Sequence, residues 1–456
     1  MKLIYDIKDR PSFGKLIVFA IQQLLAIMAA TLVVPVITGH GMSSAAALFG
    51  AGAGTLIYVL FTKASSPVFL GSSFAFLGSM AAAFAGGVSM QLGYIGLILG
   101  AIFAGLVYVV IALIVKLAGV AWIDKLMPAV VIGPTVAIIG LSLAGNAIGD
   151  LTKGSVIVED VAVASPLIAV VCGLVTLAVT MLCATFGKKF SRLIPFIIGI
   201  LAGYAVALIF TIIGNSANID ALKVLNTAPL AALTENGVTL NTFFSAPDFT
   251  FLTAAKGLKE INPSYVISIL VAYVPVAFVV FAEHIADHKN ISTIIERDLL
   301  KEPGLHRTRL GDGVGSMVGA FFGGCPNTTY GESIGCVAIT RNASVATIIT
   351  AAIGAILISF INPFVAFVNS IPSCVMGGVC MALYGFIAVS GLKMVQKVDL
   401  EQNSNLFVVS VILIAGIGGL TLTFGKVTIT SVACALILGI LTNLMLSRKN
   451  KEKTEE

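Results

Sequence analysis

The chain has 456 residues, of which 58% are hydrophobic and only 11% are charged, and its formal net charge is +5. A soluble domain carries about 25% charged residues because its surface faces water, so this composition excludes an ordinary soluble enzyme. Basic residues in so apolar a chain mark loops at a membrane surface rather than a nucleic-acid interface. The lipid bilayer is therefore the expected partner, with no nucleic acid.

Apolar segments long enough to cross a bilayer recur along nearly the whole chain. In chain order we expect fourteen, at residues 15–38, 43–62, 68–85, 91–117, 126–145, 163–187, 192–214, 264–287, 306–324, 325–340, 343–361, 372–391, 405–421 and 427–446. The first run lacks the small-residue cleavage site of a signal peptide, so we expect it to be a first span. The seven cysteines form no CxxC pair and lie in or beside apolar segments, which predicts no disulfide framework.

Two of these segments are interrupted by residues that break helices. ASSPVFLGSSFAF (64–76) and GGCPNTTYGES (323–333) contain Pro, Gly, Ser and Thr, and each predicts a short extended stretch before a short helix. Each is the third segment of its half of the chain. Interrupted segments at corresponding positions are typical of transporters built from inverted repeats, with the binding site near the bilayer midplane.

The basic residues predict the orientation of the chain. If both termini and every second loop are cytoplasmic, the only Lys and Arg residues left outside are Lys153, Lys223, Lys256, Lys259 and Lys426. This bias fits the positive-inside rule. It predicts a cytoplasmic N-terminal segment (1–14), a cytoplasmic tail (447–456) and an extracellular loop (215–262), which we expect to form a small ordered cap.

The carboxyl groups in apolar segments that we single out are Glu283, Asp287 and Glu332. A charge at membrane depth is costly and usually marks a substrate or ion pathway. Glu283 and Asp287 are four residues apart and share one helical face, whereas His284 and His288 lie on the neighbouring strip. For Asp287 and His288 a polar helix end at the membrane interface is an equally open interpretation.

A metal site is an alternative interpretation of EHIADH (283–288), which places two histidines four residues apart beside two carboxylates. Only His40 and His306 remain as further imidazoles, and both lie at predicted span ends, so the ligand set is short. No HExxH, Walker A or GxSxG motif accompanies it. The sequence thus indicates no enzyme, no catalytic residue and no bound metal.

The chain resembles the nucleobase/ascorbate transporters (nucleobase-cation symporter type 2), specifically their bacterial uracil permease branch. The resemblance covers essentially the whole chain and rests on LGSSFAF (70–76), AEH (282–284), DLLKEPGLHR (298–307), PNTTYGESIGCVAITR (326–341) and PSCVMGGVCMALYG (372–385). The family signature falls on Glu332 to Arg341. Gly335 and Thr340 are in place, whereas Ser333 replaces the signature's Asn.

The resemblance implies an all-α polytopic membrane protein with fourteen transmembrane segments in two inverted seven-span repeats and short antiparallel strands in spans 3 and 10. A core domain would comprise spans 1–4 (15–120) and 8–11 (263–361), and a gate domain spans 5–7 (121–214) and 12–14 (362–446). The resemblance further implies proton-coupled import of uracil across the plasma membrane by alternating access. It implies a homodimer, and no cofactor beyond the coupling H⁺.

The resemblance also implies roles for individual residues. Those expected to bind substrate are Glu283, Glu332, Phe74, Tyr330, Gly331, Ala30 and Tyr384. The two carboxyl groups would hold the ring and Phe74 would pack on its face. Gln23 and Asp287 stand where the family pattern has histidines, so the proton route rests on Glu283, Asp287 or His288.

The chemistry of uracil suits this set of residues. Its rim alternates N–H donors with C=O acceptors, which one ionised and one protonated carboxyl group can bind. Because burial in a low dielectric favours a protonated carboxyl group, Glu283 can couple proton binding to substrate binding. Xanthine or another purine is the alternative substrate, although that pattern usually has Gln at the position of Glu332. A channel or anion transporter of the same fold is an alternative from a different functional class. Two buried carboxylates argue against it, because they would repel an anion.

Overall fold

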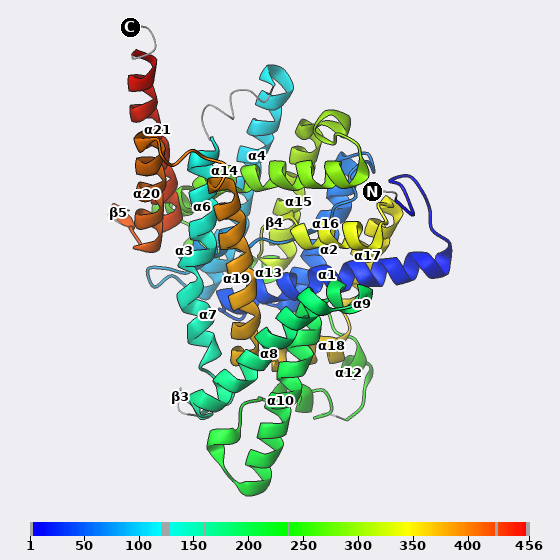
Figure 1. Ribbon diagram of the computed structural model, residues 1–456. Helices are drawn as coiled ribbons and strands as arrows, with labels where there is room; N and C mark the ends of the chain where they lie inside the picture. The colour runs from blue at the N-terminus through cyan, green and yellow to red at the C-terminus, as the bar shows by residue number, and fades with distance from the viewer. Residues whose placement is uncertain (1–2, 120–127, 159–160, 236, 425–426, 453–456) are drawn as a thin grey trace.

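The computed structural model describes residues 3–119, 128–158, 161–235, 237–424 and 427–452 (Figure 1). Eight helical stretches in this described part are long and apolar enough to cross a membrane. They are α1 (Phe13–Thr38), α2 (Ser44–Phe61), α4 (Met90–Ala118), α6 (Ala129–Ser142) with α7 (Ala144–Leu151), α8 (Pro166–Phe186), α10 (Pro195–Ala217), α14 (Pro263–Ile295) and α19 (Ser373–Val395). The chain is a mostly helical, multi-pass membrane protein.

Shorter helices complete the fold. They are α3 (Leu77–Ala83), α9 (Lys189–Leu193), α15 (Leu305–Gly323), α16 (Gly331–Thr340), α17 (Val345–Ile358), α18 (Asn362–Ser370), α20 (Asn403–Ile417) and α21 (Ser431–Glu452). Within 215–262 the described residues form α11 (Ala228–Ala231), α12 (Leu240–Phe243) and α13 (Thr250–Lys256). The loop expected to form a cap therefore contains short helices, while the expected domain boundary at 120/121 lies outside the described residues.

Both interrupted segments have the predicted form. Strand β1 (Leu70–Ser72) pairs antiparallel with β4 (Asn327–Thr329), in the register Leu70 to Thr329 and Ser72 to Asn327. A 3-10 turn (Phe74–Phe76) and α3 follow β1, and α16 follows β4. Because a non-helical backbone inside a membrane must find hydrogen-bond partners within the protein, each strand satisfies the other.

Close packing of α2 against α15 holds β4 in place. A Cβ atom at Gly50 would lie 2.5 Å from the carbonyl oxygen of Gly319, so the two helices meet backbone to backbone. The side chain of Asn327 fits into this contact, and its Nδ2 donates to the Gly50 carbonyl at 3.0 Å. Larger side chains at these glycines would push the strand away from the helices.

Two further strand pairs and one helix break were not predicted from the sequence. Strand β5 (Leu422–Phe424) pairs antiparallel with β6 (Val427–Ile429) before α21, and β2 (Ile157–Val158) pairs with β3 (Val161–Ala162). The expected span 126–145 is divided at Leu143 into α6 and α7.

Candidate functional site

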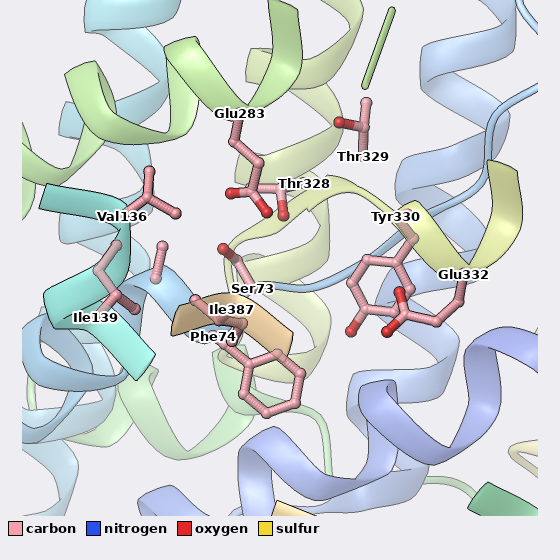
Figure 2. Close-up of a pocket in the computed structure, with 12 residues that line it drawn as sticks. Ser73, Phe74, Val136, Ile139, Glu283, Thr328, Thr329, Tyr330, Glu332 and Ile387 are labelled. Carbon is pink, nitrogen blue, oxygen red and sulfur yellow. The ribbon is translucent and has the colours of Figure 1, made fainter. Parts of the chain in front are cut away.

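A pocket of about 540 Å³, its open mouth included, lies beside the β1–β4 pair (Figure 2). Its walls come from both interrupted segments and from α6, α14 and α19. The lining residues are Ser73, Phe74, Ala75, Val136, Ile139, Glu283, Thr328, Thr329, Tyr330, Gly331, Glu332 and Ile387. A pocket therefore lies at the two interrupted segments, where the sequence predicts a binding site.

The two carboxyl groups approach the pocket from different helices. Glu283 extends from α14, and Glu332 from the first turn of α16, on the opposite side in Figure 2. The side chain of Glu283 is open to the pocket and that of Glu332 is half-buried. A planar polar ligand between them would meet a hydrogen-bonding group at either end.

Aromatic rings form another wall of the pocket. Phe74, just after β1, lies half-buried on the side away from Glu283 (Figure 2). Tyr384 of α19 packs edge-to-face against it with ring centroids 6.1 Å apart. Tyr384 is buried and stands behind Phe74 rather than in the pocket lining.

Tyr330 and Gly331 join β4 to α16. Tyr330 keeps an extended backbone, and its N–H donates to the Phe69 carbonyl at 3.2 Å, while Gly331 is the first residue of α16. The Tyr330 hydroxyl donates to the Ser72 carbonyl at 2.5 Å, which brings the ring across β1. The resemblance implies that both are strand residues whose backbone faces the base, whereas Tyr330 lies just after β4 and Gly331 belongs to the helix. Ala30 is buried in α1 and is not among the residues that line the pocket.

The groups expected to carry the proton point in different directions. Asp287 accepts a hydrogen bond from the Thr329 hydroxyl of β4 at 2.7 Å. His288 is buried, its Nδ1 lies 2.9 Å from the His284 carbonyl, and its Nε2 lies 2.8 Å from the Tyr58 hydroxyl of α2. Asp287 thus contacts the pocket wall, whereas His288 faces α2.

A buried ion pair lies close to His284 on α15. Arg309 donates to Asp312 Oδ2 at 2.7 Å, and His284 Nδ1 lies 3.0 Å from the same oxygen. The Arg309 guanidinium lies 3.3 Å above the ring of Tyr108. Among the described residues no group of three or more His, Cys, Asp or Glu side chains could hold a metal ion.

Two of the three departures from the family pattern, Gln23 and Ser333, meet in the fold. Gln23 of α1 donates through Nε2 to the Ser333 hydroxyl, which also accepts the Phe69 N–H at 3.0 Å. All three groups are buried. Ser333 therefore joins α1 and the start of β1 to the residue beside Glu332.

The rest of the signature follows α16 away from the pocket. Gly335 lines a second cavity that shares Glu332 with the first. Thr340 donates from its hydroxyl to the Cys336 carbonyl at 2.7 Å. Arg341 ends the helix in a left-handed conformation, with φ of 56°. These residues shape and terminate α16 rather than line the first pocket.

Sequence reasoning missed several lining residues. Ser73 is one of them: it is 2% exposed, its hydroxyl has no hydrogen-bond partner among the described residues, and it lies on the Glu283 side of the pocket (Figure 2). Its place after the Gly-Ser-Ser break could have identified it. Val136, Ile139 and Ile387 carry no such signal, because α6 and α19 reach the pocket only through tertiary packing.

Comparison with known proteins decides the family. The family described as "Permease family" (Xan_ur_permease) matches residues 14–424. The chain belongs to this permease family. This result confirms the resemblance to the nucleobase-cation symporters of type 2, and the protein is a permease-family transporter rather than an enzyme.

Relatives of this permease are similar over their whole length. A protein named uracil permease from Bacillus subtilis (strain 168) is 37% identical over 458 residues, covering 100% of this chain and 98% of the relative. The uracil permease of Bacillus caldolyticus is 40% identical over 98% of this chain and 95% of its own. The uracil permease of Escherichia coli (strain K12) is 34% identical over 99% and 95%.

Solved structures of low sequence identity share the fold. The transmembrane domain of the cyanobacterial bicarbonate transporter BicA matches with a TM-score of 0.62 at 14% identity, covering 94% of this chain and 97% of that one. Murine Slc26a9, an anion transporter in the inward-facing state, matches with a TM-score of 0.64 at 11% identity over 97% and 69%. At these identities the likeness concerns the fold alone.

Proposed function

We propose that this permease is a proton-coupled symporter that imports uracil across the plasma membrane. The observation that carries the proposal is the single pocket in which Glu283, Glu332 and Phe74 come together beside the β1–β4 pair. Full-length relatives named uracil permease support the choice of substrate.

Recognition would use complementary hydrogen bonding on the rim of the base. An ionised carboxylate accepts from a ring N–H, and a protonated carboxyl group donates to a carbonyl oxygen. The N-terminal end of α16 begins at the pocket with Gly331, and its free backbone N–H groups can donate to the second carbonyl. Phe74 would cover one face of the ring. No cation is needed in the pocket to bind this neutral ligand.

Coupling would follow from the protonation of Glu283. When protonated, this group is the donor that the substrate requires, so each binding event strengthens the other. Asp287, held by Thr329, is positioned to exchange that proton along the same face of α14. His288, directed toward Tyr58, supports the helix contact instead.

The transport cycle would move a core domain against a gate domain. We assign spans 1–4 and 8–11 to the core and the remaining spans to the gate, in two inverted repeats of seven, with both termini cytoplasmic. The pocket lies where α14, β1 and β4 of the proposed core face α6 and α19 of the proposed gate. In this arrangement two copies would associate through their gate domains.

Uptake of labelled uracil into proteoliposomes of purified protein tests the proposal. We expect accumulation that requires an acidic exterior and continues in excess unlabelled xanthine. Accumulation of uracil that is independent of the acid gradient would contradict proton coupling. Uptake blocked by xanthine would replace the pyrimidine by a purine as substrate.

A further inference from the structure

The N-terminal segment (residues 3–9) is built into the fold beside the link between α16 and α17. The Ile4 N–H donates to the Arg341 carbonyl at 2.8 Å, and the Ala343 N–H donates to the Tyr5 carbonyl at 2.9 Å. The Val345 N–H donates to the Ile7 carbonyl at 3.0 Å. Figure 1 shows the N-terminus lying beside α17. These bonds form a short parallel ladder rather than a loose tail.

Side chains reinforce this ladder. Ile7 is 4% exposed and belongs to the same buried apolar cluster as Val345 of α17. The Ser344 hydroxyl donates to the Asp9 carbonyl at 2.6 Å. The segment also turns on itself, because the Asp6 N–H donates to Asp9 Oδ2 at 2.8 Å. Residues 3–9 are therefore a formed element anchored at the end of α16.

The same segment also reaches the end of α14. Asp6 accepts a hydrogen bond from the Arg297 guanidinium, in an ion pair just beyond the helix. Ile291 and Ile295, in the last turns of α14, belong to the apolar cluster that contains Ile7. One short segment thus contacts residues at the C-terminal ends of both helices that carry the pocket carboxyl groups, Arg297 just after α14 and Arg341 at the cap of α16.

Both helices, α14 and α16, end at a residue in the left-handed conformation, which sets the direction in which the chain leaves the helix toward the N-terminal segment. Glu296 caps α14 with φ of 55° and Arg341 caps α16 with φ of 56°, so each chain leaves its helix in a defined direction. At 1.5 Å per residue, the end of α16 lies roughly 12 Å from Glu332 and the end of α14 roughly 18 Å from Glu283. Because helices are stiff over such lengths, a displacement of either end would move its carboxyl group.

We propose that residues 3–9 form a strap that positions Glu283 relative to Glu332, with Asp6 as the positioning residue at α14. The inference rests on the proposed function, because the spacing of the two carboxyl groups matters only if they bind one ligand together. The strap touches neither the pocket nor the substrate. It acts through the two helices.

A strap-release variant tests this inference. The double variant Ile4→Pro/Ile7→Ser removes the Ile4 N–H that donates to Arg341 and the buried apolar side chain of Ile7. Lys8→Gln, at an exposed position of the same segment, is the matched control. Calorimetric titration of the purified full chain with uracil should show Kd raised by about tenfold or more in the release variant, because a small misplacement of a binding group is costly. The control should stay within about twofold of the wild-type Kd. A folded release variant with the wild-type Kd would overturn the strap.

A charge-swap set gives a second, milder test. Asp6→Arg and Arg297→Asp should each raise Kd by about two- to fivefold, since an exposed ion pair is worth up to about 1 kcal/mol, and the double exchange should restore it. Equal Kd values in all four proteins would overturn the positioning role, even if the release variant fails to fold. Absence of uracil binding by the wild type would instead contradict the proposed function, so the two failures are distinct.

Discussion

Glu283 and Glu332 are separated by almost fifty residues and reach one pocket from two helices. Neither makes an ion pair among the described side chains, so their charges are free to respond to a ligand and to protons. Ser73, beside Glu283 in the pocket lining, adds a hydroxyl with no partner among the described residues. At the scale of single residues, the pocket therefore offers polar side chains that can hydrogen-bond to a ligand, with the ring of Phe74 in its wall.

Glu283→Gln should separate binding from coupling. The amide is a permanent donor, so we expect the variant to bind uracil in calorimetric titration but not to accumulate it against a gradient in proteoliposomes. Glu401→Gln, an exposed carboxyl group outside the pocket, should retain both properties. Normal acid-driven accumulation by Glu283→Gln would remove this residue from the proton route.

Ser333→Ala should lower stability rather than only binding. It would leave Gln23 Nε2 and the Phe69 N–H as buried donors without acceptors, at a cost of about 1–3 kcal/mol. Adding Gln23→Leu should cost less than the sum of the two single changes, because the residues share one bond. Unfolding midpoints in detergent measure this, with Ser12→Ala, whose side chain caps no helix N–H, as control. Additive effects would show that the bond is not formed.

At the scale of elements, the site depends on two strands of three residues and the helices that follow them. Gly71 of β1 lies directly under the ring of Tyr330, and a Cβ atom there would collide with that ring. The ring crosses β1 and bonds to Ser72, so it also fixes the start of α16. The strand pair and the position of Glu332 are therefore coupled.

Gly71→Ala should displace Tyr330 and weaken uracil binding by at least about tenfold. Gly78→Ala in α3 is the matched control, because its added Cβ atom would meet nothing within 4 Å. For both variants, the measurement is the increase in unfolding temperature caused by saturating uracil. An unchanged rise in Gly71→Ala would mean that the ring relocates without disturbing the pocket.

The sequence predicts the interrupted elements better than the walls opposite them. Pro, Gly and Ser clusters exclude a continuous helix at 64–76 and 323–333, and a lone carboxyl group in an apolar run is conspicuous. Val136 and Ile387 look like any lipid-facing residue, because only the packing of α6 and α19 turns them inward. The pairing of β5 with β6 was missed for a similar reason: these short apolar stretches resemble the ends of neighbouring spans.

At the scale of the whole molecule, the membrane-spanning helices differ widely in burial. In the most apolar stretch of α1 and of α2, 67% of the residues are buried, whereas the corresponding shares for α8 and α10 are only 28% and 33%. Helices α8 and α10 therefore present most of their surface to lipid or to another subunit. They belong to the proposed gate domain, through which we expect two copies to associate.

Thiol labelling should establish the orientation in the membrane. Thr234→Cys, in the loop expected outside, should react with a membrane-impermeant maleimide in intact cells. Lys301→Cys, in a loop expected inside, should react only after permeabilisation. Six of the seven native cysteines are buried and should react little, and labelling of the parent protein measures the background from all seven. The reverse pattern of labelling would invert the assigned topology.

The antiparallel pairing of β1 with β4 also has a consequence during biosynthesis. Phe69 and its partner Ser333 are 264 residues apart, so at about 5–20 residues per second a ribosome needs roughly 10 to 50 s to supply the second strand. During that interval the first interrupted segment has no strand to satisfy its backbone in the bilayer. We therefore expect the nascent chain to keep this segment at the translocon, and release into lipid to follow synthesis of the second half.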